Sequence, residues 1–204
     1  MRPSLPGVIL AGGRSRRKGG GDKALMLLDH RTVLDHVVTR LRPQVTALGI
    51  NANGDPARFA GFGLPVIADS VSEYPGPLAG ILAGLDWAAA RFPGGTRLLT
   101  VAGDMPFLPD DLVRRLQAPR HAGIVCATSA GRLHPVVALW PLSIRRDLHR
   151  ALVDRGIRKV ADFIGGHHSI TIDFPLGEVD PFFNVNNPDD LATARRFIAR
   201  TARA

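Results

Sequence analysis

With 204 residues, 45% of them hydrophobic and 22% charged, the chain has the composition of a globular protein, and we expect one domain spanning residues 1–204. The apolar runs are far too short for a membrane span and no signal-peptide pattern precedes the first of them, so we expect a cytoplasmic protein without membrane contact. The net charge of +8 indicates anionic partners, but one tyrosine, two tryptophans and no recognisable nucleic-acid module argue against nucleic acid.

The stretch from Pro6 to Ala24 has the most distinctive composition. Its apolar start, Val8 to Leu10, predicts a buried parallel strand. The loop that follows contains the glycines Gly12, Gly13, Gly19, Gly20 and Gly21 and the cations Arg14, Arg16, Arg17, Lys18 and Lys23. Glycines allow backbone N–H groups to approach a ligand closely, and successive N–H groups before a helix form an anion site. Because the cations indicate a polyvalent anion, we predict a nucleoside triphosphate site with Lys23 on the phosphates; the alternative is a disordered basic surface loop.

Two common phosphate-binding motifs do not describe this loop. A Walker A loop requires Ser or Thr after Gly-Lys, whereas the sequence here is Gly21-Asp22-Lys23-Ala24. Residues 19–24 formally match the dinucleotide pattern GxGxxG/A, but they lie about ten residues beyond the strand and no acidic residue stands near 39–44 to bind a ribose. We interpret that match as accidental.

Helical and strand patterns alternate along the rest of the chain. Thr32 is a suitable N-cap for a helix of apolar spacing up to Leu41, and Pro77 suits the first position of another helix. Further helices are predicted near 112–116, 142–153 and 158–164 and from 188 onward, and strands at 45–50, 64–68, 97–102, 123–127, 135–140, 169–174 and 182–185. This alternation predicts a three-layer αβα fold, Rossmann-like, with a mostly parallel sheet to which the later segments add an antiparallel element.

Four predicted strands end in glycine or polar residues. The endings are Ala11-Gly12-Gly13, Asn51-Ala52-Asn53, Asp69-Ser70 and Gly103-Asp104. Because ligands of open α/β sheets bind beyond the carboxyl ends of the strands, we expect these endings to converge on one cleft.

Asp104 is the strongest candidate for a metal ligand. A carboxylate at a strand end beside a triphosphate is well placed to hold Mg²⁺, which prefers one or two carboxylates together with phosphate oxygens. The alternative is a turn or N-cap aspartate, since Asp-x-Pro also suits turns. Asp69 has the same two interpretations. Asn51 offers an amide for a base or ribose edge. His134 is either a substrate contact or a structural turn residue.

The motifs together resemble the nucleotidyltransferase signature of the molybdenum cofactor guanylyltransferases. They are Leu10-Ala11-Gly12-Gly13, Arg16-Arg17, Gly19-Gly20, Asp22-Lys23, Asn51-Ala52-Asn53, Asp69-Ser70, the run from Tyr74 to Gly80, Gly103-Asp104-Met105-Pro106 and the run from Phe183 to Pro188. They occur in family order over nearly the whole chain. One departure is Lys18 and an additional glycine, where the family usually has a methionine before the glycine pair.

The resemblance implies transfer of GMP from GTP to the terminal phosphate of molybdenum-bound molybdopterin, with release of pyrophosphate. It implies GTP binding by the N-terminal half and acceptor binding by the C-terminal half. The implied GTP contacts are Leu10, Ala11, Gly12, Gly13, Lys23, Asn51, Asp69 and Asp104, with Asp104 also on Mg²⁺, Arg16 and Arg17 on the pyrophosphate portion, and Asn184 and Asn186 on the pterin side. Molybdoenzyme apoproteins or their chaperones are candidate protein partners.

The absence of a recognisable general base agrees with this chemistry. A phosphate monoester has a second pKa of roughly 6, so the attacking oxygen is already ionised near neutral pH. Catalysis then consists of aligning two polyanions and neutralising charge on the leaving pyrophosphate. Two alternatives stay open: a related nucleotidyltransferase that uses CTP or a sugar phosphate, and a module that binds GTP or carries the cofactor without chemistry.

Overall fold

The computed structural model describes residues 5–12, 22–71 and 76–201. Within these residues, seven strands form a central sheet in the order β5-β4-β1-β6-β8-β7-β9. β8 is antiparallel to both its neighbours, and the other pairs are parallel. The strands are β1 (Pro6–Leu10), β4 (Ala47–Asn51), β5 (Val66–Ile67), β6 (Arg97–Ala102), β7 (Ile124–Ser129), β8 (Arg132–Pro141) and β9 (Ser169–Asp173). The mostly parallel sheet predicted from the sequence is confirmed, and β8 is its antiparallel element.

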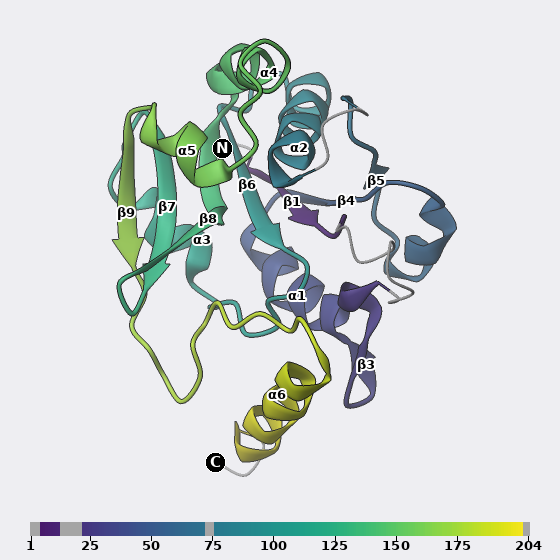
Figure 1. The fold of residues 1–204 in the computed structure, drawn as a ribbon. Helices are drawn as coiled ribbons and strands as arrows, with labels where there is room; N and C mark the ends of the chain where they lie inside the picture. Colours follow the sequence, from purple (N-terminus) through teal and green to yellow (C-terminus); the bar gives the residue numbers. More distant parts are fainter. Residues whose placement is uncertain (1–4, 13–21, 72–75, 202–204) are drawn as a thin grey trace.

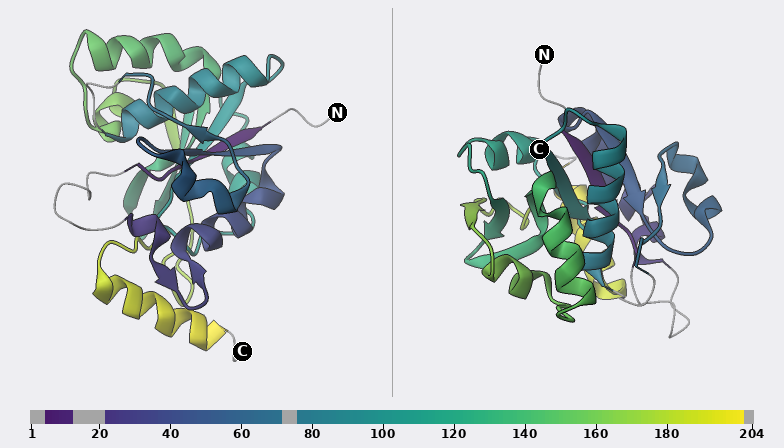
Figure 2. Two further views of the ribbon diagram at one scale, coloured as in Figure 1. Left: turned by 90° about the vertical axis from the view of Figure 1, so that its right-hand side faces the viewer. Right: turned by 90° about the horizontal axis from the view of Figure 1, so that it is seen from above.

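Helices cover both faces of the sheet and produce three layers (Figures 1 and 2). One face carries α2 (Pro77–Arg91), α4 (Arg145–Val153) and α5 (Val160–Gly165), and the other carries α1 (Val33–Leu41) and α3 (Leu112–Gln117). In β1, Val8 packs toward the first group of helices and Ile9 toward the second, so the strand is buried on both sides as its apolar run predicts. No helix in the described residues is long and apolar enough to cross a membrane.

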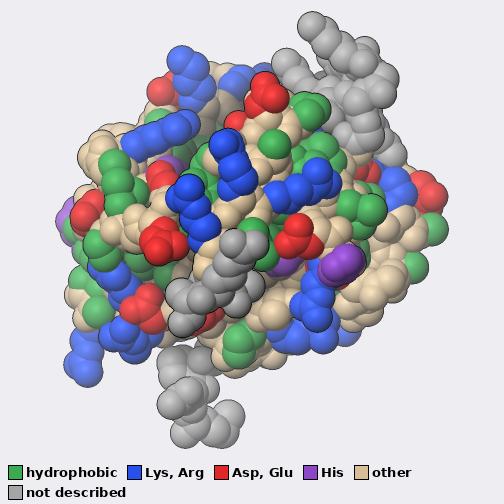
Figure 3. All heavy atoms as spheres, turned by 90° about the horizontal axis from the view of Figure 1, so that it is seen from below, with side chains coloured by type: hydrophobic (Ala, Val, Ile, Leu, Met, Phe, Trp, Pro, Cys, Tyr) green, Lys and Arg blue, Asp and Glu red, His purple; other side chains and the backbone are tan. Residues whose placement is uncertain are grey.

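α6 (Pro188–Thr201) lies outside the three layers, beside the small hairpin of β2 (Leu27–Leu28) and β3 (Arg31–Thr32) (Figure 1). A separate apolar cluster joins them, formed by Leu28, Val33, Val185 and Ala194. The face of the molecule seen from below intermixes basic and acidic side chains, without a continuous patch of one sign (Figure 3). This mixed surface gives no support to a nucleic-acid interface on that face.

Local sequence signals account for several element boundaries. Thr32 and Asp35 form a capping box at the start of α1, in which the Thr32 hydroxyl accepts from the Asp35 N–H and the Asp35 carboxylate accepts from the Thr32 N–H. α2 begins at Pro77 after Gly76, whose φ of +145° is open only to glycine. Short 3-10 helices connect the elements: η2 (Lys23–Leu25), η3 (Arg42–Gln44), η4 (Pro56–Phe62) and η5 (Leu142–Ile144).

The strand predicted at 182–185 is wrong. Phe182 and Val185 are buried, but they lie in a turn and an extended segment, in which the Val185 N–H donates to the Asp104 carbonyl at 2.8 Å. The apolar residues of this segment therefore anchor a loop onto the end of β6, and their burial does not come from a place in the sheet. The helix predicted over 142–153 also divides, because its first turn is the 3-10 helix η5.

Candidate functional site

The carboxyl ends of β1, β4, β5 and β6 lie side by side at one edge of the sheet, as predicted. Backbone hydrogen bonds continue past the strand ends. The Ala11 N–H donates to the Asn51 carbonyl at 2.9 Å, and the Gly103 N–H donates to the Leu10 carbonyl at 3.0 Å. These bonds hold the start of the glycine-rich loop between the Asn51 ending on one side and the Gly103-Asp104 ending on the other.

Asn51, Asn53 and Asp69 form a compact polar cluster at the ends of β4 and β5. The Asn51 amide donates to the Asp69 carboxylate at 2.8 Å and to the Ile67 carbonyl at 3.0 Å, so both amide hydrogens are used inside the protein. The Asn53 amide donates to the other Asp69 oxygen at 2.7 Å, and its own oxygen accepts from the Asp69 N–H at 2.8 Å. Asn51 therefore fixes the position of Asp69, and its own side chain is buried.

Gly80 in α2 leaves room for the Asn51 side chain. A Cβ added at position 80 would lie 2.2 Å from Asn51 Oδ1 and 3.1 Å from Leu10 Cδ2, well inside contact distance. Sequence reasoning did not assign Gly80 to the site. The available signal was its place in a helix interior, where glycine costs about 0.5–1 kcal/mol relative to alanine and needs a compensating reason.

Asp104 lies half-buried after β6, and the segment from Asn184 to Asn186 packs against it. Its backbone carbonyl accepts the Val185 N–H, which fixes the neighbouring Asn184 beside it. Asp104 Oδ1 and Asn184 Oδ1 are both buried side-chain oxygens without a hydrogen-bond partner. Burial raises the pKa of the Asp104 carboxyl, while its own backbone N–H and the charge of Lys23 act in the opposite direction. A buried oxygen without a partner is costly, which favours a bound ligand or cation beside Asp104.

Lys23 opens η2 and faces the same place. Its ammonium donates to Asn186 Oδ1 at 3.2 Å, and its charge acts on Asp104. A residue from the start of the chain, one from the end of β6 and one from the final loop therefore converge. Gly12 is exposed and lies beside Asn51 and Ala52, at the end of β4. The predicted contacts Gly13, Arg16 and Arg17, like Lys18, lie outside the described residues.

The residues around Asp104 fit a hard divalent cation. They offer one carboxylate and an amide oxygen, the donor type that Mg²⁺ prefers. The described residues hold no group of three or more His, Cys, Asp or Glu side chains that could bind a metal by themselves. A site with one carboxylate suits Mg²⁺, because that ion usually completes its shell with waters and substrate phosphates.

His134 belongs to a structural cluster that supports the final loop. It is 6% exposed, and its ring centre lies 4.6 Å from that of Phe182, with the two rings tilted by 44°. The Ser129 hydroxyl donates to Asp180 at 2.8 Å, so the contact of 2.8 Å between Ser129 Oγ and His134 Nε2 requires the histidine nitrogen to donate. Burial lowers the pKa of His134, with Asp180 acting in the opposite direction and Arg132 adding to the shift. The structural interpretation of His134 is therefore the better one.

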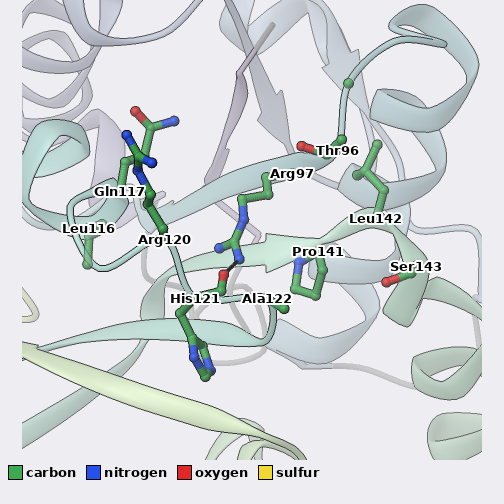
Figure 4. A pocket seen from close by; sticks show the side chains of 11 residues that line it. Thr96, Arg97, Leu116, Gln117, Arg120, His121, Ala122, Pro141, Leu142 and Ser143 are labelled. Atoms are coloured by element: carbon green, nitrogen blue, oxygen red, sulfur yellow. Dashed lines mark hydrogen bonds between the residues drawn. The ribbon is translucent and has the colours of Figure 1, made fainter. Parts of the chain in front are cut away.

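A pocket of about 740 Å³ lies at the opposite edge of the sheet, where β6 and β7 begin (Figure 4). Arg97 stands in its centre, and its guanidinium donates to the carbonyls of His121 and Gly123. Arg97 thus joins the starts of two strands. This pocket contains none of the predicted site residues.

Comparison with known proteins shows the family of this chain. The model of the MobA-like NTP transferase domain matches residues 7–169. A molybdenum cofactor guanylyltransferase of Rhodopseudomonas palustris (strain BisB5) is 52% identical over 204 residues, covering 98% of this chain and 97% of the relative. The chain belongs to the molybdenum cofactor guanylyltransferase family. Another member, from Mesorhizobium japonicum, is 52% identical and covers 97% of this chain and 98% of its own length.

Solved structures agree with the family at the level of the fold. The molybdopterin-guanine dinucleotide biosynthesis protein A from Archaeoglobus fulgidus superposes with a TM-score of 0.71 at 23% identity, covering 96% of this chain and 99% of its own. Because the family relatives match nearly the full length, the similarity includes the final loop and α6, which lie beyond the domain model.

Proposed function

We propose that this guanylyltransferase family member transfers GMP from GTP to the terminal phosphate of molybdenum-bound molybdopterin and releases pyrophosphate. The observation that carries the proposal is the convergence of Lys23, Asp104 and Asn186 at the carboxyl edge of the sheet. Family membership supports the choice of guanine and of the pterin acceptor, since its curated relatives carry the name molybdenum cofactor guanylyltransferase.

The two substrates divide the chain between them. We assign GTP to the N-terminal half, with Leu10, Ala11, Gly12 and Gly13 approaching through their backbones and the Asn51–Asp69 cluster beside them. The acceptor belongs to the C-terminal half, where Asn184 and Asn186 lie next to Asp104. Both halves belong to one catalytic unit, because residues of each contribute to the same cluster.

The reaction needs charge neutralisation and alignment. An oxygen of the acceptor's terminal phosphate attacks the α-phosphorus of GTP, a new P–O bond forms, and the bond to the β-phosphate breaks with its electrons leaving on pyrophosphate. The attacking phosphate is ionised near neutral pH, so no side chain has to remove a proton. Lys23, with Arg16 and Arg17, offsets the charge on the departing pyrophosphate, and the amides of Asn184 and Asn186 orient the acceptor.

Asp104 is the residue that would hold Mg²⁺ at this site. An ion held there would supply positive charge that offsets the negative charge of the phosphates. Among the described residues, Asp104 has the only buried carboxylate oxygen without a hydrogen-bond partner. Its pKa is raised by burial, and a cation beside it would lower that pKa and favour the ionised form. We place the reaction in the cytoplasm, where GTP is available.

Product analysis tests this proposal. Purified protein, GTP and molybdenum-loaded molybdopterin with Mg²⁺ should give equal amounts of pyrophosphate and of a pterin–GMP conjugate, detected by mass spectrometry. Omitting the pterin should abolish pyrophosphate release. Saturable GTP binding without conjugate formation would instead favour a binding or carrier module.

A further inference from the structure

Arg58 lies in η4, just after the end of β4, and its guanidinium is held from several directions. It donates to the Asn53 carbonyl at 2.8 Å and to the Asp55 carbonyl at 3.0 Å, and its carbon lies 4.8 Å from the centre of the Phe59 ring. Its side chain is 21% exposed. A planar guanidinium with bonds to two carbonyls and an aromatic face beneath it has little freedom to turn.

The same guanidinium forms an ion pair with Asp22, the residue directly before Lys23. The Asp22 side chain is only 17% exposed, and its carbonyl accepts the Leu25 N–H at 2.9 Å, which closes the 3-10 turn that carries Lys23. The position of Asp22 therefore determines where the Lys23 backbone begins. A change in this ion pair would move the ammonium that reaches Asn186.

Arg58 thus connects two parts of the site that are far apart in the sequence. On one side it holds the Asn53 carbonyl, and the Asn53 side chain in turn holds Asp69. On the other side it holds Asp22 and, through it, Lys23. It also neutralises a carboxylate that would otherwise stand beside Lys23, compete for its ammonium and repel a triphosphate.

We propose that Arg58 is a positioning residue for nucleotidyl transfer, which acts through Asp22 to place Lys23 and keeps the Asn53–Asp69 cluster in register with it. The proposal rests on the transfer function proposed above. In this role Arg58 acts through Asp22 and Asn53 and not by contact with a reacting atom. Its effect on GTP comes from the geometry of Lys23 and from screening the Asp22 charge.

A double-mutant cycle between Arg58 and Asp22 tests this role. Arg58→Ala should lower kcat/KM for GTP by roughly 100-fold, since misplacement of about 1 Å can cost that much. Asp22→Asn should have a smaller effect, because the residue remains polar and Arg58 keeps its carbonyl bonds. The double variant should be more active than Arg58→Ala alone, because it no longer carries an unpaired carboxylate beside Lys23.

Further variants separate positioning from general damage. Arg58→Lys keeps the charge without the planar fork and should restore only part of the activity. Added guanidinium at millimolar concentration should partly rescue Arg58→Ala and leave the wild type unchanged. Arg42→Ala is the matched control: Arg42 donates to the Phe62 carbonyl of the same η4 at 3.2 Å, but no contact joins it to Asp22. It should behave like the wild type.

GTP affinity, measured by calorimetry alongside turnover, separates failure of this proposal from failure of the proposed function. If the wild type binds GTP but transfers no GMP, the proposed function fails. The double-mutant cycle between Arg58 and Asp22 is then evaluated from GTP affinities instead of kcat/KM. Multiplicative losses in the double variant, or equal losses in Arg42→Ala, would overturn the positioning role. So would wild-type kinetics in Arg58→Ala. If Arg58→Ala does not fold, Asp22→Asn with normal GTP affinity and turnover would overturn it as well.

Discussion

At the scale of single residues, Lys23 supplies the charge on which the proposed transfer depends. Lys23→Gln keeps a polar side chain that can reach Asn186 but removes the charge, so we expect kcat/KM for GTP to fall by roughly 100-fold or more. Steady-state pyrophosphate release measures this. Lys159→Gln, an exposed lysine before α5, is the control and should have wild-type rates. Near-normal transfer by Lys23→Gln would remove Lys23 from the mechanism.

Asp104 combines a functional requirement with a cost in stability. Asp104→Asn should lose transfer activity, because the variant lacks the only negative charge that the site offers to the cation. In the absence of ligands it should also melt at a higher temperature than the wild type at pH 7.

The sign of that stability change follows from the pKa of Asp104. Burial raises this pKa in the folded state, so the folded protein binds the proton more tightly than the unfolded chain and loses stability as the pH rises. The difference in melting temperature should therefore shrink toward the unfolded-state pKa of about 4. Thermal unfolding at pH 7 and near pH 4 tests this, and a variant less stable than the wild type at pH 7 would contradict it.

Gly80 tests whether the place of Asn51 matters for the nucleotide. Gly80→Ala puts a Cβ against Asn51 Oδ1 and should displace its bond to Asp69, weakening GTP affinity by roughly 10-fold, the loss expected for a charge-assisted hydrogen bond. Gly84→Ala, one turn further along α2, meets Leu98 and Val8 instead and should lower stability while GTP affinity stays the same. Calorimetric titration of both variants distinguishes them. Equal affinity in the two would show that the Asn51 contact has no role in binding.

The sequence allowed the polar strand endings to be predicted because each one follows an apolar run directly. It could not show that both amide hydrogens of Asn51 are used internally, since that depends on Asp69 from another strand. Gly80 and Arg58 could not be predicted as site residues for the same reason. Their roles come from contacts with residues 29 and 36 positions away in the sequence, Asn51 and Asp22, and not from local composition.

At the scale of elements, the β7–β8 hairpin supports the loop that carries Asn184 and Asn186. Ala130 and Gly131, both with positive φ, make the tight turn that places Ser129 near His134. The Ser129 hydroxyl then donates to the Asp180 carboxylate, which also accepts the Phe182 N–H at 2.9 Å. A buried hydrogen-bonded network of this kind fixes a loop more firmly than its apolar contacts alone.

The hairpin cluster predicts a pH effect on stability. Burial lowers the pKa of His134, so the unfolded chain binds the proton more readily and stability is lost as the pH falls through about 6.5, the unfolded-state value. His134→Gln should remove part of this dependence, because glutamine can donate to Ser129 without titrating. Urea unfolding at pH 7.5 and 5.5 measures both proteins. An equal loss of stability in the two would exclude His134 as the source.

Helices were predicted correctly where the spacing of apolar residues and a capping residue agree, as in α1 with its Thr32–Asp35 capping box. It failed at 182–185, where two buried apolar residues suggested a strand. There the backbone bonds to the Asp104 carbonyl and to the turn at Asp180, so the partners that decide its conformation lie in other loops.

At the scale of the whole molecule, the sheet order explains how one site is assembled from the two ends of the chain. β1 lies between β4 and β6, so the glycine-rich loop emerges between the Asn51 and Asp104 endings. The segment after β9 then returns across the end of β6 (Figure 1), where the Val185 N–H bonds the Asp104 carbonyl and Asn186 accepts from Lys23. The fold class followed from the strand and helix alternation, whereas this return path did not.

The proposed transfer of GMP to a pterin phosphate takes place at the carboxyl edge of the sheet, where Lys23, Asp104 and Asn186 converge. The most direct measurement is pyrophosphate release with GTP, CTP, ATP or UTP, each with molybdenum-loaded molybdopterin or a sugar phosphate as acceptor. We predict rapid release only with GTP and the pterin together, and loss of that release in Lys23→Gln. Pterin-dependent release with CTP and not with GTP, or release with a sugar phosphate alone, would contradict it.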